Sequence, residues 1–168
     1  IFVQQTTATL PSTVCSGLSV SFSGSGFNGI ANYIESATTL QNRNCVLSFW
    51  ARGPVVTLGV FVNQVTGSNT NVFSGNATLS NSWQQFSFTF AMPSTSVTPG
   101  TGRVEVVIGA ASSWSMEIAQ VQLEDGTLPS EFEYRPYSEE LKMCQRFYET
   151  GSVHMMGYAL APSVAYMT

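Results

Sequence analysis

Six short segments of the chain alternate apolar and polar residues, and clusters of Gly, Ser, Asn and Pro separate them. In the segment 86–90, three phenylalanines take one side while Ser87 and Thr89 take the other. The other segments lie at 18–22, 46–52, 58–62, 104–108 and 121–123. A period of two is typical of strands with one buried face. Many short strands separated by turn residues predict an all-β fold, an antiparallel β-sandwich or jelly roll.

A change of phase predicts one irregular strand near the end of this pattern. Met116 and Ile118 share one phase, whereas Ala119, Val121 and Leu123 share the other. A β-bulge inserts one extra residue into a strand and shifts its alternation. We therefore expect a bulge near Ile118 and Ala119, where the strand bends or changes sheets.

Turn and helix signals follow the last strand. Pro129 and Pro136 exclude a helix between them, because proline fixes φ and biases the preceding residue toward extended conformations. Ser138 is a suitable N-cap for a helix over 138–148, and Gly151 a suitable C-cap. We expect two regions: a jelly-roll sandwich over 1–127, then over 128–168 a strap, this short helix and the start of a truncated element.

The composition disfavours several functions. Charged residues make up 10% of the chain and the net charge is −4, against about 25% charged residues in a typical domain. No basic stripe exists for nucleic acid, and no apolar run is long enough for membrane insertion. With one His (His154), one Asp (Asp125) and one Lys (Lys142), no set of nucleophile, base and orienting group emerges. We expect a protein that is not an enzyme, although Glu105 and Glu117 on different strands could still meet as a glycosidase pair.

No metal or cofactor site is evident in the sequence. Asp125 has no acidic cluster around it, so we predict no metal ligands, although backbone carbonyls could still hold a structural calcium. The three cysteines, Cys15, Cys45 and Cys144, show no metal-binding spacing. We interpret them as buried free thiols, with a Cys15–Cys45 disulfide as the alternative.

The segment after the last strand also resembles a known family. It reads QLEDGTLPSEFEYRPYSEELKMCQRFYE (122–149), and upstream stand VLSFWAR (46–52) and SWQQFSFTF (82–90). These strings resemble tail-fibre proteins of tailed phages and prophages, in which a jelly roll similar to carbohydrate-binding modules ends in this signature. The resemblance covers roughly residues 15 to 150. It implies a non-enzymatic virion protein of a tail appendage, assembled as a homotrimer in the host cytoplasm and in contact with other virion proteins.

Aromatic and amide side chains are the candidates for recognising a host glycan. Trp114, in a loop of small residues, is the first candidate platform; the alternative is a Trp folded over the edge of its own sandwich. Asn69 and Asn71 could supply hydrogen bonds on another rim. We predict that Trp50 belongs to the core, because it adjoins Phe49.

Other aromatic and apolar residues are expected to anchor the C-terminal region. Phe132, Tyr134 and Tyr137 would pack the strap onto a sheet or onto a neighbouring subunit, because exposed aromatics are unfavourable in water. Leu141 and Phe147 would form the apolar side of the helix and a trimer contact.

The favoured function is a tail-fibre domain that binds, or is presented to, host surface glycans. The alternative is a purely structural virion adaptor or spacer that touches no sugar. A bacterial carbohydrate-binding module attached to an enzyme would fit the sandwich equally well, but it would not explain the Arg-Pro-Tyr and Cys-Gln-Arg segment. A jelly roll alone does not decide among these functions.

Overall fold

The computed structural model describes residues 2–6, 17–133, 135–145, 157–161 and 164–167. The chain forms two compact units, Ile1–Phe132 and Glu133–Thr168. The sandwich unit thus includes residues 128–132, which the sequence assigns to the strap. These residues belong to it because Ser130 is hydrogen-bonded to Glu124 of the last sandwich strand.

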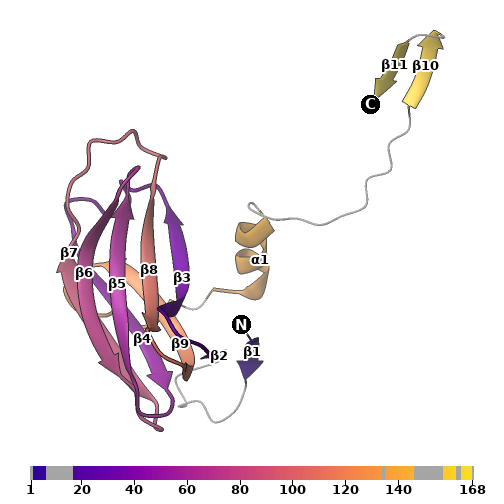
Figure 1. Cartoon of the computed structure of the whole chain (residues 1–168). Coiled ribbons are helices and arrows are strands. Elements are labelled where there is room, and N and C mark those ends of the chain that lie inside the picture. The colour runs from indigo at the N-terminus through magenta and orange to yellow at the C-terminus, as the bar shows by residue number, and fades with distance from the viewer. Residues whose placement is uncertain (1, 7–16, 134, 146–156, 162–163, 168) are drawn as a thin grey trace. The chain divides into compact units, whose positions relative to one another are not determined.

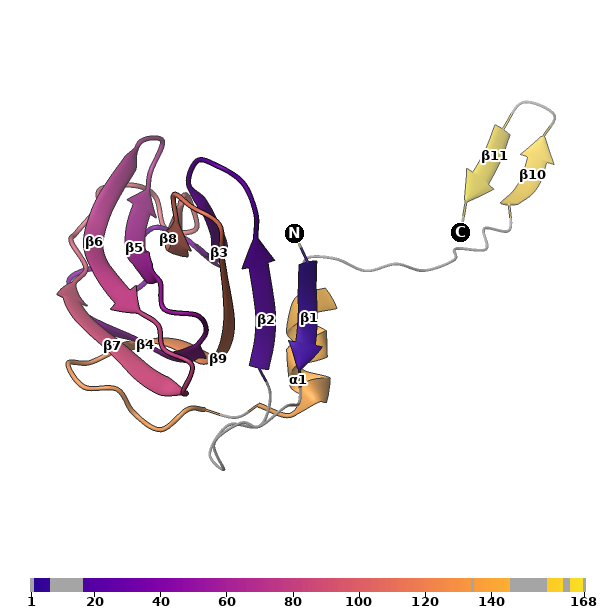
Figure 2. The same ribbon diagram turned by 60° about the horizontal axis from the view of Figure 1, so that its bottom comes forward.

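The first unit contains two antiparallel sheets that face each other (Figure 1). Figure 2 separates the two layers. The five-stranded sheet has the order β1 (Phe2–Thr6), β2 (Gly17–Phe22), β9 (Trp114–Asp125), β4 (Asn44–Arg52) and β7 (Gln84–Ala91). The four-stranded sheet has the order β3 (Asn28–Glu35), β8 (Arg103–Ala110), β5 (Thr57–Val65) and β6 (Asn69–Thr78). The predicted all-β sandwich is confirmed.

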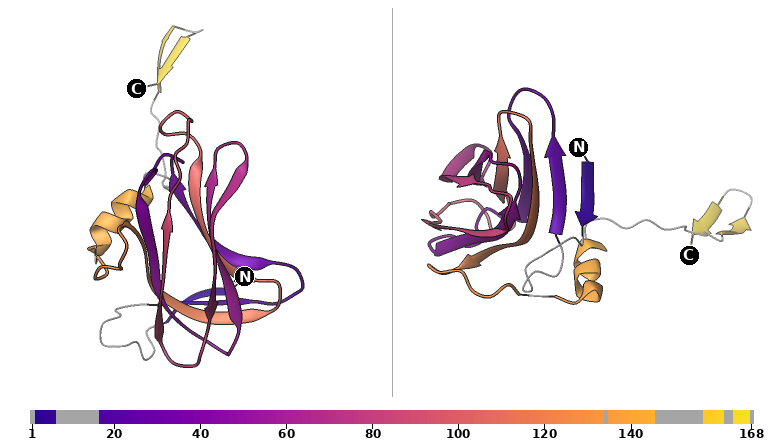
Figure 3. Two further views of the ribbon diagram at one scale, coloured as in Figure 1. Left: turned by 90° about the vertical axis from the view of Figure 1, so that its left-hand side faces the viewer. Right: turned by 90° about the horizontal axis from the view of Figure 1, so that it is seen from below.

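Figure 3 shows the two sheets from two further sides, and the core lies between them, filled by alternate residues of the strands. In β4, Leu47 and Phe49 point inward and are fully buried, whereas Ser48 between them points outward and lines the opposite face. Opposite them, Leu58 and Val60 of β5 are equally buried. Removing these side chains from water provides the main driving force for sheet packing.

The expected bulge lies in β9. The pairing of β4 with β9 shifts register between Ser48, which faces Gln122, and Trp50, which faces Ala119. Gln120 within the shifted segment has φ of 51°, a left-handed conformation that non-glycine residues rarely adopt. The strand stays in the five-stranded sheet, and the bulge changes which side chains reach its outer face.

Three glycines lie in register across β3, β8 and β5, and two of them, Gly29 and Gly109, let β3 and β8 approach closely. Gly109 pairs with Gly29 on one side and with Gly59 on the other. A Cβ atom on Gly109 would lie 2.6 Å from the Cα atom of Gly29 and would also meet the carbonyl oxygen of Asn28. On Gly59 a Cβ atom would instead meet the ring of Phe61, at 2.6 Å.

The second unit contains helix α1 (Tyr137–Gln145) and an antiparallel hairpin of β10 (Gly157–Ala161) and β11 (Val164–Met167). The helix begins one residue before the predicted cap Ser138, and the Glu139 amide donates to the carbonyl of Pro136. Its predicted end at 148, with Gly151, lies outside the described residues. Tyr134 and Phe147 also lie outside them.

Candidate functional site

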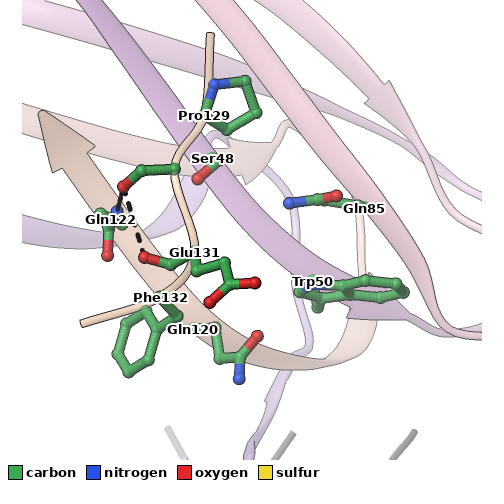
Figure 4. Close-up of a pocket in the computed structure, with 9 residues that line it drawn as sticks. Ser48, Trp50, Gln85, Gln120, Gln122, Pro129, Glu131 and Phe132 are labelled. Carbon is green, nitrogen blue, oxygen red and sulfur yellow. Dashed lines mark hydrogen bonds between the residues drawn. The ribbon is translucent and has the colours of Figure 1, made fainter. Parts of the chain in front are cut away.

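The outer face of the five-stranded sheet carries a groove of about 500 Å³, a size typical of sites for small molecules. Residues 127–132, here called the strap loop, leave β9 and cross this face. The groove runs between the strap loop and the sheet (Figure 4). Its lining residues are Ser48, Trp50, Gln85, Gln120, Gln122, Pro129, Ser130, Glu131 and Phe132.

Trp50 supplies the aromatic surface of the groove. Because Phe49 points into the core, strand alternation turns Trp50 outward, where it is half-buried. Its neighbours across the sheet are Gln85 of β7 and Ala119 of β9. The prediction that Trp50 belongs to the core is therefore wrong. The alternation of 46–52 contained the signal, because Trp50 has the same phase as Ser48.

Amide side chains surround the ring. Gln85 of β7 pairs with Trp50, and Gln122 of β9 pairs with Ser48, which precedes Trp50 by two residues on the same face of β4. Gln120, from the bulge of β9, lines the same groove. Each glutamine amide offers both a donor and an acceptor, so the groove combines an apolar ring with several two-way hydrogen-bonding groups.

The strap loop is fixed to the sheet by side-chain hydrogen bonds. Ser130 donates to the Glu124 carboxylate from its amide at 2.8 Å and from its hydroxyl at 2.6 Å, and Gln122 donates to the Ser130 hydroxyl at 3.0 Å. Near its start, the hydroxyl of Thr89 donates to the carbonyl of Thr127 at 3.1 Å. These contacts hold Pro129, Glu131 and Phe132 as one wall of the groove.

The hydrogen bonds at Glu124 also shift its acidity. Partial burial acts to raise the pKa of this carboxyl, but the hydroxyl and amide of Ser130 and the amide of Gln122 act in the opposite direction. The hydrogen bonds prevail, so the pKa of Glu124 lies below its ordinary value. The contact with the strap loop is thus made by an ionised carboxylate.

The groove carries one negative charge. Of its nine lining residues, Glu131 is the only one with an ionisable side chain. The nearby guanidinium of Arg52 bonds both carboxylate oxygens of Glu117, at 3.0 and 2.9 Å, and lies 5.1 Å from the ring centre of Trp83. The arrangement suits a ligand with a flat apolar face and many hydroxyl groups more than an anion.

The predicted platform Trp114 lies elsewhere. It is 5% exposed, its indole nitrogen donates to the carbonyl of Asn28 at 3.0 Å, and its ring packs on Phe22 with centroids 4.8 Å apart. This position corresponds to the alternative interpretation, a Trp folded into the edge of its own sandwich.

Asn69 and Asn71 belong to the other sheet, on strand β6. The Asn71 amide donates to the side-chain oxygen of Asn63 at 3.0 Å and accepts from the hydroxyl of Ser74 at 2.8 Å. Asn69 pairs with Val65 at the start of the strand. The structure therefore brings neither residue to Trp114 or to the groove.

The structure also shows where three of the predicted anchors and the two candidate carboxylates lie. Phe132 lines the groove and is 41% exposed, and on α1 Tyr137 and Leu141 are exposed as well. Glu105 is on the four-stranded sheet and Glu117 on the five-stranded sheet, each in an ion pair with an arginine. Both side chains point away from the core, on opposite sides of the sandwich, so the two carboxylates do not meet.

Two further features can be stated for the part of the chain that the structure describes. It contains no group of three or more His, Cys, Asp or Glu side chains placed to bind a metal ion. None of its helices has the length and apolar character needed to cross a membrane.

A second concavity, between the sheets at the edge formed by β2 and β3, is lined mainly by aliphatic residues such as Leu18, Ile30 and Ile118. It lacks an aromatic surface, so we consider the groove with Trp50 the better candidate.

Neither a protein-family model nor a curated protein sequence matches the chain. Among solved structures, the chain is similar to a family 4 carbohydrate-binding module at 14% identity, covering 74% of this chain and 78% of that one with a TM-score of 0.54. It is also similar to the C-terminal family 22 carbohydrate-binding module of Clostridium thermocellum Xyn10B, in which a cleft takes part in ligand binding. For this module the sequence identity is 16%, the match covers 76% of this chain and 83% of the module, and the TM-score is 0.55.

A third similar structure comes from a phage. The enzymatically active domain of tailspike protein 4 of bacteriophage CBA120 matches at 16% identity with a TM-score of 0.56. The match covers 74% of this chain but 18% of that one, so this chain corresponds to a small part of the tailspike structure. At these identities the likeness concerns the fold: the chain has the jelly-roll β-sandwich fold of carbohydrate-binding modules.

Proposed function

We propose that this chain is a non-enzymatic glycan-binding domain of a phage tail fibre or related virion appendage, and that the glycan binds in the groove beneath the strap loop. The observation that carries the proposal is the half-buried ring of Trp50, which faces outward from β4 and lies among the amides of Gln85, Gln120 and Gln122. The same fold in carbohydrate-binding modules supports it.

The chemistry of the groove fits a sugar ring. One face of a pyranose carries C–H groups and can stack on an indole ring, which presents a large apolar surface. The hydroxyl groups at the rim of the sugar both donate and accept hydrogen bonds, as do the glutamine amides around Trp50. Glu131 adds an acceptor, and charge-assisted hydrogen bonds of this kind are stronger than neutral ones.

The phage assignment rests on two supports of different kinds. The segment 122–149 resembles tail-fibre proteins, and a small part of a phage tailspike structure is similar in fold. A homotrimer, as the resemblance implies, would place three grooves on one particle. Weak binding at single sites would then be strengthened, by a factor of roughly 100 or more where the sites engage together.

One observation favours a second role, that of a structural adaptor. On α1, Tyr137 is 77% exposed, Met143 48% and Leu141 41%. Exposed apolar side chains of this size on one short helix fit a surface that a partner subunit or another virion protein covers. The two roles are compatible, because they use different units of the chain.

Binding to a glycan array tests the proposal, with polysaccharides of host surfaces and xylan, the ligand of two structural neighbours with the family 22 fold. We expect binding by the wild-type chain and its loss in Trp50→Ala. The matched control is Tyr33→Ala, which removes an aromatic side chain that is 63% exposed on the opposite sheet. Undiminished binding by Trp50→Ala would refute the site, and the absence of binding to every polysaccharide would favour the adaptor.

A further inference from the structure

We infer that the strap loop is the specificity element of the groove: Glu124 and Ser130 position it, and Glu131 excludes anionic glycans. This inference rests on the proposed glycan-binding function. It concerns residues beyond the last sandwich strand, at a place where the sequence predicts a connection to the next element.

Side-chain hydrogen bonds give the strap loop a fixed position on the sheet. Its residues 129–132 form neither helix nor strand, so backbone pairing does not fix them. They are fixed by the ionised carboxylate of Glu124, which receives two hydrogen bonds from Ser130, and by the amide of Gln122. Hydrogen bonds to an ionised group are about twice as strong as neutral ones. Glu124 and Ser130 are therefore positioning residues for the wall of the groove.

The strap loop presents a carboxylate to the groove. The residue after Ser130 is Glu131, whose exposed carboxylate lines the groove near Gln120 and Trp50 (Figure 4). No lining residue carries a positive charge. The arginines at the two ends of β4 are paired with acidic partners, Arg52 with Glu117 and Arg43, just before the strand, with Asp125.

The charge of Glu131 affects neutral and anionic ligands differently. A neutral sugar can donate hydroxyl hydrogen bonds to the Glu131 carboxylate. A sugar that carries a carboxylate, such as a uronic acid, would instead meet a like charge without a compensating cation. Two exposed unit charges about 5 Å apart repel with an energy that corresponds to roughly a fourfold loss of affinity. The groove should therefore select neutral or amino sugars over uronic acids.

The experiment compares matched polysaccharides on the full chain at low salt: a neutral xylan and a glucuronic-acid-substituted xylan, with corresponding neutral and uronate-bearing bacterial polysaccharides. The quantity measured is the ratio of the two dissociation constants. We expect wild-type protein to prefer the neutral member, and Glu131→Gln to reduce that preference by about fourfold. At about 1 M salt, where the screening length is roughly 3 Å, the preference should largely vanish in wild type.

A second pair of variants tests the positioning residues. Ser130→Ala removes the hydroxyl that bonds Glu124 and Gln122, whereas Ser130→Thr retains a hydroxyl. We expect Ser130→Ala to reduce the preference for neutral glycans as Glu131→Gln does, and Ser130→Thr to preserve it. A role of Ser130 in stability alone would change both affinities together and leave their ratio unchanged.

The outcomes separate this inference from the proposed function. If wild type binds glycans and Trp50→Ala does not, but Glu131→Gln leaves the ratio and its salt dependence unchanged, then the specificity role is refuted and the binding site stands. If no binding depends on Trp50, then the proposed site fails, and the inference fails with it.

Discussion

The carboxylate of Glu124 receives both the amide and the hydroxyl of Ser130, at 2.8 and 2.6 Å. These two residues lie six positions apart, on either side of the turn that ends β9, and they tie the strap loop back onto the strand that it has just left. The contact gives the outer face of the five-stranded sheet a wall. It also makes the wall dependent on the charge of one carboxyl group.

This dependence predicts how the strap loop responds to acid. Because the hydrogen bonds hold the pKa of Glu124 below its ordinary value of 4.5, the ionised form stabilises the docked strap loop. Its contribution is complete above the ordinary pKa and is lost as the pH falls through the lower pKa of the folded state. We expect the exchange protection of the Ser130 amide, measured by NMR, to decline only below about pH 4.5 beyond the ordinary pH dependence of exchange.

The control for this prediction is Glu124→Gln, which keeps an acceptor but cannot ionise. In that variant the protection should be weaker at neutral pH and should lack the additional loss in acid. A wild-type protein whose Ser130 amide loses its protection between pH 7 and pH 5 would contradict the assignment.

The close approach of β3 and β8 predicts a large stability effect at a small residue. In Gly109→Ala the added methyl group would meet backbone atoms of Asn28 and Gly29, so the two strands must separate. Overpacking of this kind typically costs about 1–3 kcal/mol. Gly59→Ala is the matched variant, because its methyl group meets the end of the Phe61 ring, which can rotate away. Denaturant unfolding should show a clearly larger loss for Gly109→Ala, and equal losses would contradict this account.

Cys45 is predicted to be an inert thiol in the folded protein. It is fully buried, and among the described residues it is a free cysteine. Burial and the charge of Asp125 raise the pKa of its thiol, against the opposing effect of Arg43. Because the thiolate is the reactive form, alkylation at pH 8 followed by peptide mass spectrometry should leave Cys45 unmodified until the protein is unfolded. Rapid native modification at Cys45 would contradict its burial.

The helix α1 gives a prediction about assembly. If the chain forms the proposed trimer through the exposed apolar residues of this helix, Leu141→Asp should shift the sedimentation coefficient toward that of the monomer, because a charge at the contact would be desolvated. The exposed residue Lys142 supplies a control, Lys142→Ala, which should remain a trimer. A Leu141→Asp variant that still sediments as a trimer would exclude the helix as the contact.

The alternation of the sequence was sufficient to predict the sandwich and the bulge, because a buried face imposes a period of two on every strand. The same alternation placed Trp50 opposite Phe49, yet the neighbouring apolar residues favoured a core position. Propensity alone could not show that Trp114 donates to the carbonyl of Asn28, because that contact joins residues 86 positions apart. It joins β9 to β3, strands of different sheets, and therefore depends on how the two sheets pack together.

The strap loop was harder to predict for a physical reason. Pro129 indicated only that the segment is not helical, and an extended segment has no period that shows which surface it follows. Its position depends on Glu124 and Gln122, which the bulge of β9 brings to the outer face. Without the register shift at Gln120, the later residues of the strand would have the opposite phase.

The most direct test of the central claim is an NMR titration of the full chain with the best-bound neutral oligosaccharide. The account predicts that the indole N–H signal of Trp50 and the side-chain amide signals of Gln85, Gln120 and Gln122 shift together, while the indole signal of Trp114 remains unchanged. Saturation of these four groups with a single affinity would establish the groove as the site. Shifts confined to Asn63, Asn71 and Tyr33 on the four-stranded sheet, with a silent Trp50, would contradict it.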